Sequence, residues 1–157
     1  MDANEFQSIR HKLLKTQRQM SELLGVSLKA VQSFEQGWRS ISPYIERQAL
    51  FLLAMKMESQ QPLPPCWEVR GCPRQMQDAC PAWEFKSGHL CWFINGTICQ
   101  GKHRKSWSQK MALCKTCKVF TSFMKHWGLP LKRRSYKQRE KRIEGNLSKG
   151  RKLLPPH

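Results

Sequence analysis

Residues 16–37, TQRQMSELLGVSLKAVQSFEQG, carry the signals of two short helices joined by a tight turn. Thr16 can cap the N-terminus of the first helix, and Gly25 can adopt the left-handed conformation that ends it. Ser27 can cap the second helix, and Gly37 can end it. Apolar residues recur in both segments at the three- and four-residue spacing of a helix. The stretch therefore predicts a helix, a tight turn and a second helix.

The same pattern extends over residues 1–58. Ser42 followed by Pro43 is a strong start signal, with serine at the cap and proline at the first helical position. Each apolar stripe is only about three turns long, so these helices must pack on one another to be stable. We expect a mainly α fold whose first domain, residues 1–58, is a bundle of four to five helices. The stripes are Phe6, Ile9, Leu13 and Leu14; Met20, Leu23 and Leu24; Val31 and Phe34; and Ile45, Leu50 and Leu53.

This first domain resembles the XRE and Cro/phage repressor family of helix-turn-helix DNA-binding proteins. The resemblance covers about residues 5–57 and rests on Gln17, the Gly-Val-Ser turn at residues 25–27, and the Glu-x-Gly element at residues 35–37. It implies that the helix after the turn reads double-stranded DNA in the major groove, and that a homodimer binds a two-fold operator. The implied base-reading residues are Ser27, Leu28, Lys29, Gln32 and Ser33, and the implied phosphate contacts are Gln17, Trp38 and Arg39.

The side chains of Lys29 and Gln32 are chemically suited to base edges, lysine to guanine acceptors and glutamine to adenine. Residues 1–58, however, carry 8 positive and 6 negative charges, a net of only +2. This low charge leaves open a bundle that only mediates protein contacts. If the domain binds DNA, the low charge predicts that phosphate affinity is supplemented from elsewhere in the chain.

The whole chain of 157 residues has 28 Lys and Arg against 11 Asp and Glu, a net charge of +17. This balance excludes an acidic binding surface as the main feature and indicates a polyanionic partner, nucleic acid first and an anionic membrane surface second. A Pro-rich linker at residues 59–65 separates the first domain from the rest, and we expect it to decouple the two. Residues 59–127 contribute +7 and residues 128–157 contribute +8, so the excess lies outside the first domain.

The basic tail, residues 128–157, carries ten Lys and Arg against two Glu. We expect it to be disordered in the free protein and to bind the phosphate backbone without reading bases. Lys132, Arg133 and Arg134 begin its positive run and are its predicted phosphate contacts.

Residues 66–127 hold all seven cysteines, with the spacing C-x5-C-x7-C-x10-C-x7-C-x14-C-x2-C. The CxxC pair lets two thiolates reach one metal ion. Seven thiols allow one four-thiolate zinc site or one cubane iron–sulfur cluster with three to spare, or two zinc sites if His89 or His103 joins. Buried or disulfide-bonded thiols without metal are the third possibility. The candidate metal ligands are Cys66, Cys72, Cys80, Cys91, Cys99, Cys114 and Cys117.

About residues 65–121 resemble the small two-CW cysteine-rich domain that is attached to bacterial sensor kinases and chemoreceptors. The resemblance rests on the dipeptides Cys66-Trp67 and Cys91-Trp92, on Cys80-Pro81, and on the CxxC pair Cys114 and Cys117. It implies a sensory or regulatory module and does not settle which metal is bound.

Nothing in the sequence predicts an enzyme. It has no Ser-His-Asp set, carboxylate pair or glycine-rich phosphate loop with a recognisable spacing, and thiol-redox chemistry through Cys114 and Cys117 is a minor alternative. The segment Met1 to Ser8 is polar, and the longest apolar run, Ala49 to Met55, has seven residues. We therefore expect no signal peptide, no membrane span and a cytoplasmic protein.

These patterns predict a bacterial or phage-type transcriptional regulator. It would combine a sequence-specific DNA-binding domain, a sensory module holding zinc or an iron–sulfur cluster, and a basic arm. The alternative is a non-enzymatic adaptor in a signalling pathway, in which the metal module docks a protein partner.

Overall fold

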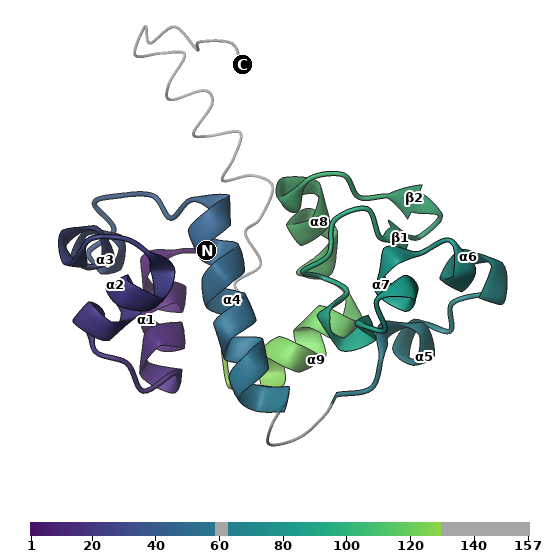
Figure 1. Ribbon diagram of the computed structural model, residues 1–157, viewed down its shortest axis with the longest axis horizontal. Helices are drawn as coiled ribbons and strands as arrows, with labels where there is room; N and C mark the ends of the chain where they lie inside the picture. The colour runs from purple at the N-terminus through teal and green to yellow at the C-terminus, as the bar shows by residue number, and fades with distance from the viewer. Residues whose placement is uncertain (59–62, 130–157) are drawn as a thin grey trace, which may run out of the picture.

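The computed structural model describes residues 1–58 and 63–129. Within them the fold is mainly α-helical, which confirms the predicted class at that level (Figure 1). Most of the predicted linker, and the basic tail from residue 130 with Lys132, Arg133 and Arg134, lies outside the described residues. The elements are α1 (Ala3–Lys12), α2 (Gln17–Leu24), α3 (Leu28–Glu35), α4 (Pro43–Glu58), α5 (Cys66–Arg70), α6 (Arg74–Asp78), α7 (Pro81–Glu84), the 3-10 helix η1 (Gly88–Leu90), β1 (Ile98–Cys99), β2 (Lys102–His103), α8 (Trp107–Cys114) and α9 (Lys118–His126).

The helix boundaries around the first turn are those that the capping residues predict. The Thr16 hydroxyl accepts the backbone N–H of Gln19, and the Gln19 side chain accepts the N–H of Thr16, which closes a capping box. Gly25 ends α2 with φ +63°, a left-handed conformation that glycine adopts without strain. The Ser27 hydroxyl accepts the N–H of Ala30 and starts α3. Three local predictions are thereby confirmed.

Two of the expected core leucines are exposed. Leu14 is 81% exposed, because α1 ends at Lys12 and Leu14 has the left-handed φ of +57°. Leu23 is 41% exposed, because α2 buries the narrower stripe that contains Met20 and Leu24. The expectation that these two side chains complete the core stripes is wrong.

A half-buried ion pair fastens α1 to α3. The Arg10 guanidinium donates from Nε to Glu35 Oε1 at 2.5 Å and from Nη2 to Oε2 at 3.0 Å. Gln17, at the start of α2, donates its amide to the same Oε2 at 2.8 Å. Burial alone would raise the pKa of Glu35, but these hydrogen bonds and the Arg10 charge hold it below its ordinary value. Three helices are thus locked by one charged network.

The cysteine-rich part consists of short helices and a two-stranded hairpin held around aromatic side chains. β1 and β2 are antiparallel, with Ile98 opposite His103. Trp92 is fully buried, and its ring lies 5.6 Å from that of Phe120 and 5.1 Å from that of Phe123, between centroids. These rings take the place of the aliphatic core that the segment lacks.

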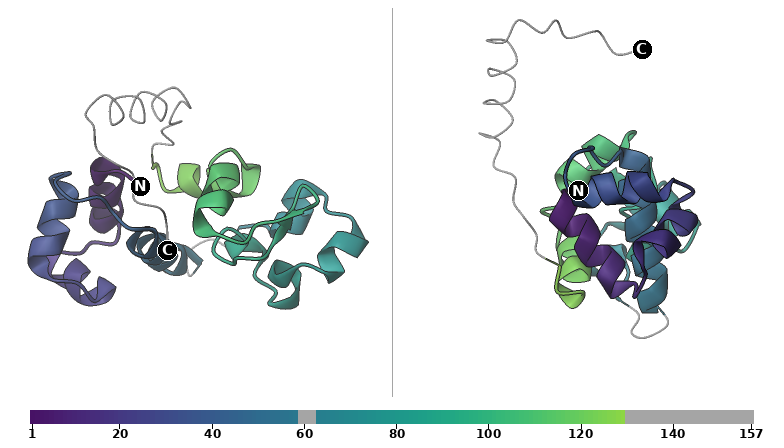
Figure 2. Two further views of the ribbon diagram at one scale, coloured as in Figure 1. Left: turned by 90° about the horizontal axis from the view of Figure 1, so that it is seen from above. Right: turned by 90° about the vertical axis from the view of Figure 1, so that its left-hand side faces the viewer.

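Helix α4 joins the two parts of the molecule (Figure 1). Seen from above, it again lies between α1–α3 and the cysteine-rich part (Figure 2). Its Phe51 ring stacks on Phe93 with centroids 4.7 Å apart, and its Arg47 guanidinium donates to the Phe93 carbonyl at 2.7 Å. One hydrophobic core runs from Phe6 through Leu50 to Trp92. The expectation that the linker decouples the two parts is therefore wrong, because α4 contributes side chains to both.

Glu46 on α4 fixes this junction electrostatically. Its Oε1 accepts the Met1 amine at 2.9 Å, and its Oε2 accepts the Trp107 indole N–H at 3.2 Å. The Lys115 ammonium lies 3.7 Å from Oε1. Burial alone would raise the pKa of Glu46, but the Met1 amine and then Lys115 and Trp107 hold it below its ordinary value.

Candidate functional site

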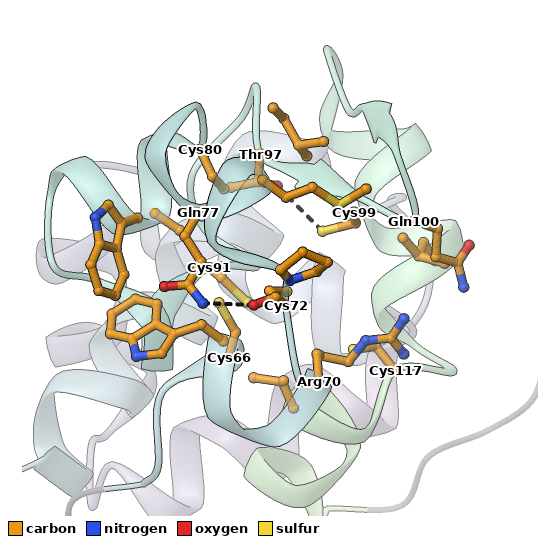
Figure 3. Close-up of a pocket in the computed structure, with 18 of the residues that line it drawn as sticks. Cys66, Arg70, Cys72, Gln77, Cys80, Cys91, Thr97, Cys99, Gln100 and Cys117 are labelled. Atoms are coloured by element: carbon orange, nitrogen blue, oxygen red, sulfur yellow. Dashed lines mark hydrogen bonds between the residues drawn. The ribbon is translucent and has the colours of Figure 1, made fainter.

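Six of the seven cysteines surround one cavity of about 210 Å³ (Figure 3). They come from separate elements, so the fold, and not the sequence spacing alone, brings them together. Cys117 of the CxxC pair lines the cavity, whereas Cys114 is buried and does not line it. All seven cysteines are free thiols. The cavity-lining cysteines are Cys66, Cys72, Cys80, Cys91, Cys99 and Cys117.

Close packing holds the wall of this cavity in shape. The rings of Trp67 and Trp83 meet edge to face with centroids 4.8 Å apart. Gly88 makes this arrangement possible, because a Cβ there would lie 2.6 Å from both Pro65 and the Trp67 ring. The Gln77 amide donates to the Cys72 carbonyl at 2.6 Å and fixes the neighbouring loop.

The cysteine donors are chemically suited to a thiolate-bound metal, since soft sulfur ligands favour zinc and iron–sulfur clusters. Within the described ranges, no three His, Cys, Asp or Glu side chains are grouped closely enough to hold one ion. The cysteines instead lie around the wall of a space. Neither His89 nor His103 lines it, so the structure does not bring a histidine to the cavity.

A hydrogen bond between two thiols of the cavity shifts their pKa values in opposite directions. The Cys91 thiol hydrogen-bonds to Cys66, which lowers the pKa of Cys66 and, together with burial, raises that of Cys91 well above its ordinary value. Burial raises the pKa of Cys114 to about 12, although the charge of Lys110 acts in the opposite direction. A metal that binds these sulfurs must therefore displace protons.

The α3 helix presents the predicted base-reading residues unequally. Ser27, Lys29 and Gln32 are exposed, whereas Leu28 and Ser33 are half-buried. The Ser33 hydroxyl donates to the Lys29 carbonyl at 2.8 Å, and the Ser27 hydroxyl is used by the cap. Lys29 and Gln32 are thus the exposed α3 residues with uncommitted polar groups. The opposite face, with Ala30, Val31 and Phe34, is buried in the core.

The predicted phosphate contacts in the first domain differ in availability. Trp38 is 80% exposed, and the exposed Arg39 places its guanidinium 5.7 Å from the Phe34 ring centroid. Gln17 is half-buried, and its amide already donates to Glu35. One of its two amide hydrogens is therefore used inside the protein.

Comparisons with protein-family models, with curated proteins and with solved structures find no match for this chain. The two family resemblances therefore rest on the residues quoted above. No helix in the described part of the chain is long and apolar enough to cross a membrane.

Nothing in the sequence marks Lys110, which the fold places against Thr97 of the cavity wall. Lys110 is one of ten positive residues between 59 and 127, and nothing in its neighbourhood distinguishes it from a surface lysine. Its spacing of four residues from Cys114 is a weak signal that both lie on one helix face.

Proposed function

We propose that this protein is a sequence-specific DNA-binding transcriptional regulator whose cysteine-rich part holds a thiolate-bound metal, either zinc or an iron–sulfur cluster. The observation that carries the DNA-binding role is the exposure of Lys29 and Gln32 on α3, directly after the left-handed turn at Gly25. An α-helix with its side chains is about 10–12 Å across, which fits the width of the major groove, about 12 Å.

The rigid setting of α3 supports this role. Readout of a base edge needs a side chain held in a fixed position by its surroundings. The Arg10–Glu35 pair joins α3 to α1, and Gln17 joins α2 to the same carboxylate. The low charge of residues 1–58 is consistent with a basic contribution from the rest of the chain, which carries +15 of the total +17. The family resemblance adds a homodimer on half-sites about one helical turn apart.

The metal part of the proposal rests on the six cysteines around one cavity. Cys66 at the start of α5, Cys91 at the end of η1 and Cys99 in β1 would supply thiolates, with Cys117 from the CxxC pair. A bound iron–sulfur cluster would supply one-electron redox chemistry, whereas zinc would only stabilise the fold. Metal analysis and an absorption spectrum of anaerobically purified protein distinguish the two.

The DNA-binding role is tested on the full chain, because α4 shares its core with the cysteine-rich part. Duplexes are selected from a random pool, and Gln32→Ala is compared with Gln7→Ala, the same change at an exposed position on α1. Gln32→Ala should cost about 1–3 kcal/mol at the selected site and little on random DNA. Gln7→Ala should bind as wild type does.

Two results would count against this role. Equal losses on selected and random DNA would contradict base reading by Gln32. Failure to enrich any duplex, with the metal retained, would favour the signalling adaptor, in which the cysteine-rich part docks a protein partner.

A further inference from the structure

The cysteine cavity is backed by a buried positive charge. Lys110 lies on α8 and is only 1% exposed. Lysine is almost never fully buried unless it is paired. Within the described residues Lys110 forms no ion pair with a carboxylate, and its hydrogen-bond partner is the neutral hydroxyl of Thr97. Its counter-charge must therefore come from another kind of group.

Lys110 lies beside the cysteines of the cavity, because its partner Thr97 is part of the cavity wall and Cys114 follows it by one helical turn on α8. Its positive charge helps to lower the pKa of Cys66 and opposes the burial that raises the pKa values of Cys91 and Cys114. Cys66 and Cys91 line the cavity. Lys110 thus lies behind the wall from which a bound metal would be held.

A hydrogen-bond relay connects the same ammonium to a fourth cysteine. An ammonium only donates, so Thr97 Oγ1 accepts from Lys110. The hydroxyl hydrogen of Thr97 is then left to point elsewhere, and the sulfur of Cys99 lies 3.7 Å from Oγ1 (Figure 3). Thr97 is itself buried and lines the cavity. The relay therefore directs a hydrogen-bond donor at the sulfur of Cys99.

We propose that Lys110 is the internal counter-cation of a metal–thiolate centre in this cavity, and that Thr97 orients Cys99 as one of its ligands. The inference rests on the proposed metal-binding role and extends it to residues that hold no metal themselves. Zinc with four thiolates, and an oxidised cubane cluster with four thiolates, each carry a net negative charge of two. One buried ammonium halves that charge where water cannot screen it. Lys110 is therefore a positioning residue, and its effect should appear in metal affinity.

The test compares Lys110→Met with Lys118→Met in the full chain. Lys118 is exposed and follows Cys117, so the control removes the same charge close to the same cavity. Zinc affinity is measured by competition with a chromophoric chelator, and metal-free stability by urea unfolding with a reductant and a chelator. Metal-free Lys110→Met should be at least as stable as wild type, since a methionine replaces an unpaired buried charge. Its zinc affinity should fall about 10- to 100-fold, while that of Lys118→Met stays close to wild type.

Thr97→Val provides a second, nearly isosteric variant. It keeps Lys110 and removes only the hydroxyl, so a zinc affinity below that of Lys118→Met supports the relay even if Lys110→Met does not fold. If iron and sulfide reconstitute a cluster, both variants should shift its reduction potential to more negative values, because reduction adds negative charge near the missing donor.

Wild-type zinc affinity in Lys110→Met overturns the inference, as does wild-type affinity in Thr97→Val. A loss of metal-free stability in Lys110→Met, with unchanged affinity in Thr97→Val, shows that Lys110 serves packing only and also overturns it. A wild-type chain that binds neither zinc nor a cluster overturns the proposed metal module as well, so the two failures are distinguishable.

Discussion

Replacing Phe93 with alanine should destabilise α1–α3, although Phe93 belongs to the cysteine-rich part. The ring is half-buried, stacks on Phe51 at 4.7 Å and lies 4.3 Å from the Arg47 guanidinium. A fully buried Phe→Ala change costs about 3–5 kcal/mol, of which a half-buried ring should lose about 2. The aromatic pair and the cation–π contact add about 1 kcal/mol together. We expect a loss of about 3 kcal/mol in the free energy of unfolding.

Native-state hydrogen exchange on the full chain measures where that loss appears. Because one core spans both parts, amides of α1–α3 and of α8–α9 should lose protection by similar amounts. Phe85→Ala is the matched control, since Phe85 is 64% exposed, and it should change stability by less than about 0.5 kcal/mol. A double-mutant cycle with Phe51→Ala should give a coupling energy of about 1 kcal/mol.

Unchanged protection of α1–α3 in Phe93→Ala would show that the two parts do not share a core. That result would mean that the first domain folds independently, as the Pro-rich linker suggested. A coupling energy of zero between Phe51 and Phe93 would remove the stacked contact as the cause.

Three further predictions concern separate features. Gly88→Ala should lower the unfolding free energy by about 1–3 kcal/mol in urea, because the new Cβ overlaps Pro65 and Trp67. If Gly88→Ala is as stable as wild type, Pro65 and Trp67 can move aside without cost. The pKa of Glu46 is lowered in the folded state, so its carboxylate stabilises the fold above the ordinary pKa of 4.5, and this stability is lost as the pH falls through the lower folded pKa. Glu46→Gln should therefore reduce the fall in unfolding free energy at acidic pH, and an unchanged fall would contradict a stabilising role for the Glu46 carboxylate. Deleting residues 131–157 should weaken binding to all DNA sequences alike and reduce the salt slope by about 0.9 for each phosphate that the tail neutralises in the wild-type complex, whereas an unchanged slope would exclude the tail from DNA binding.

The helix boundaries near Gly25 could be predicted because they depend on neighbours within a turn. The Thr16 and Ser27 caps and the left-handed glycine are local events. Leu14 and Leu23 were predicted wrongly because an apolar residue at helical spacing is buried only if the helix continues past it and a neighbour covers it. Both conditions depend on tertiary structure.

The contact of α4 with both parts is indicated by a sequence feature that the single apolar stripe leaves out. Beyond Ile45, Leu50 and Leu53, the helix carries Phe51 and Leu52, and apolar residues on more than one face indicate a helix covered on more than one side. Residue type marks all seven cysteines as candidate ligands, but which of them line the cavity depends on how the short helices and the hairpin pack. The burial and role of Lys110 were not predictable, because they depend on its hydrogen bond to the hydroxyl of Thr97, thirteen positions earlier in the chain.

The position of α4 also bears on how such a chain can change over generations. Leu50 lines one small cavity together with Ile9 of α1 and Met111 of α8, so a substitution there is tolerated only if two distant segments accommodate it together. Recombination at the linker would combine α4 with a cysteine-rich part from another sequence, and one face of α4 would then pack poorly. The two parts should therefore be inherited as a pair, with α4 as the segment in which their sequences constrain each other.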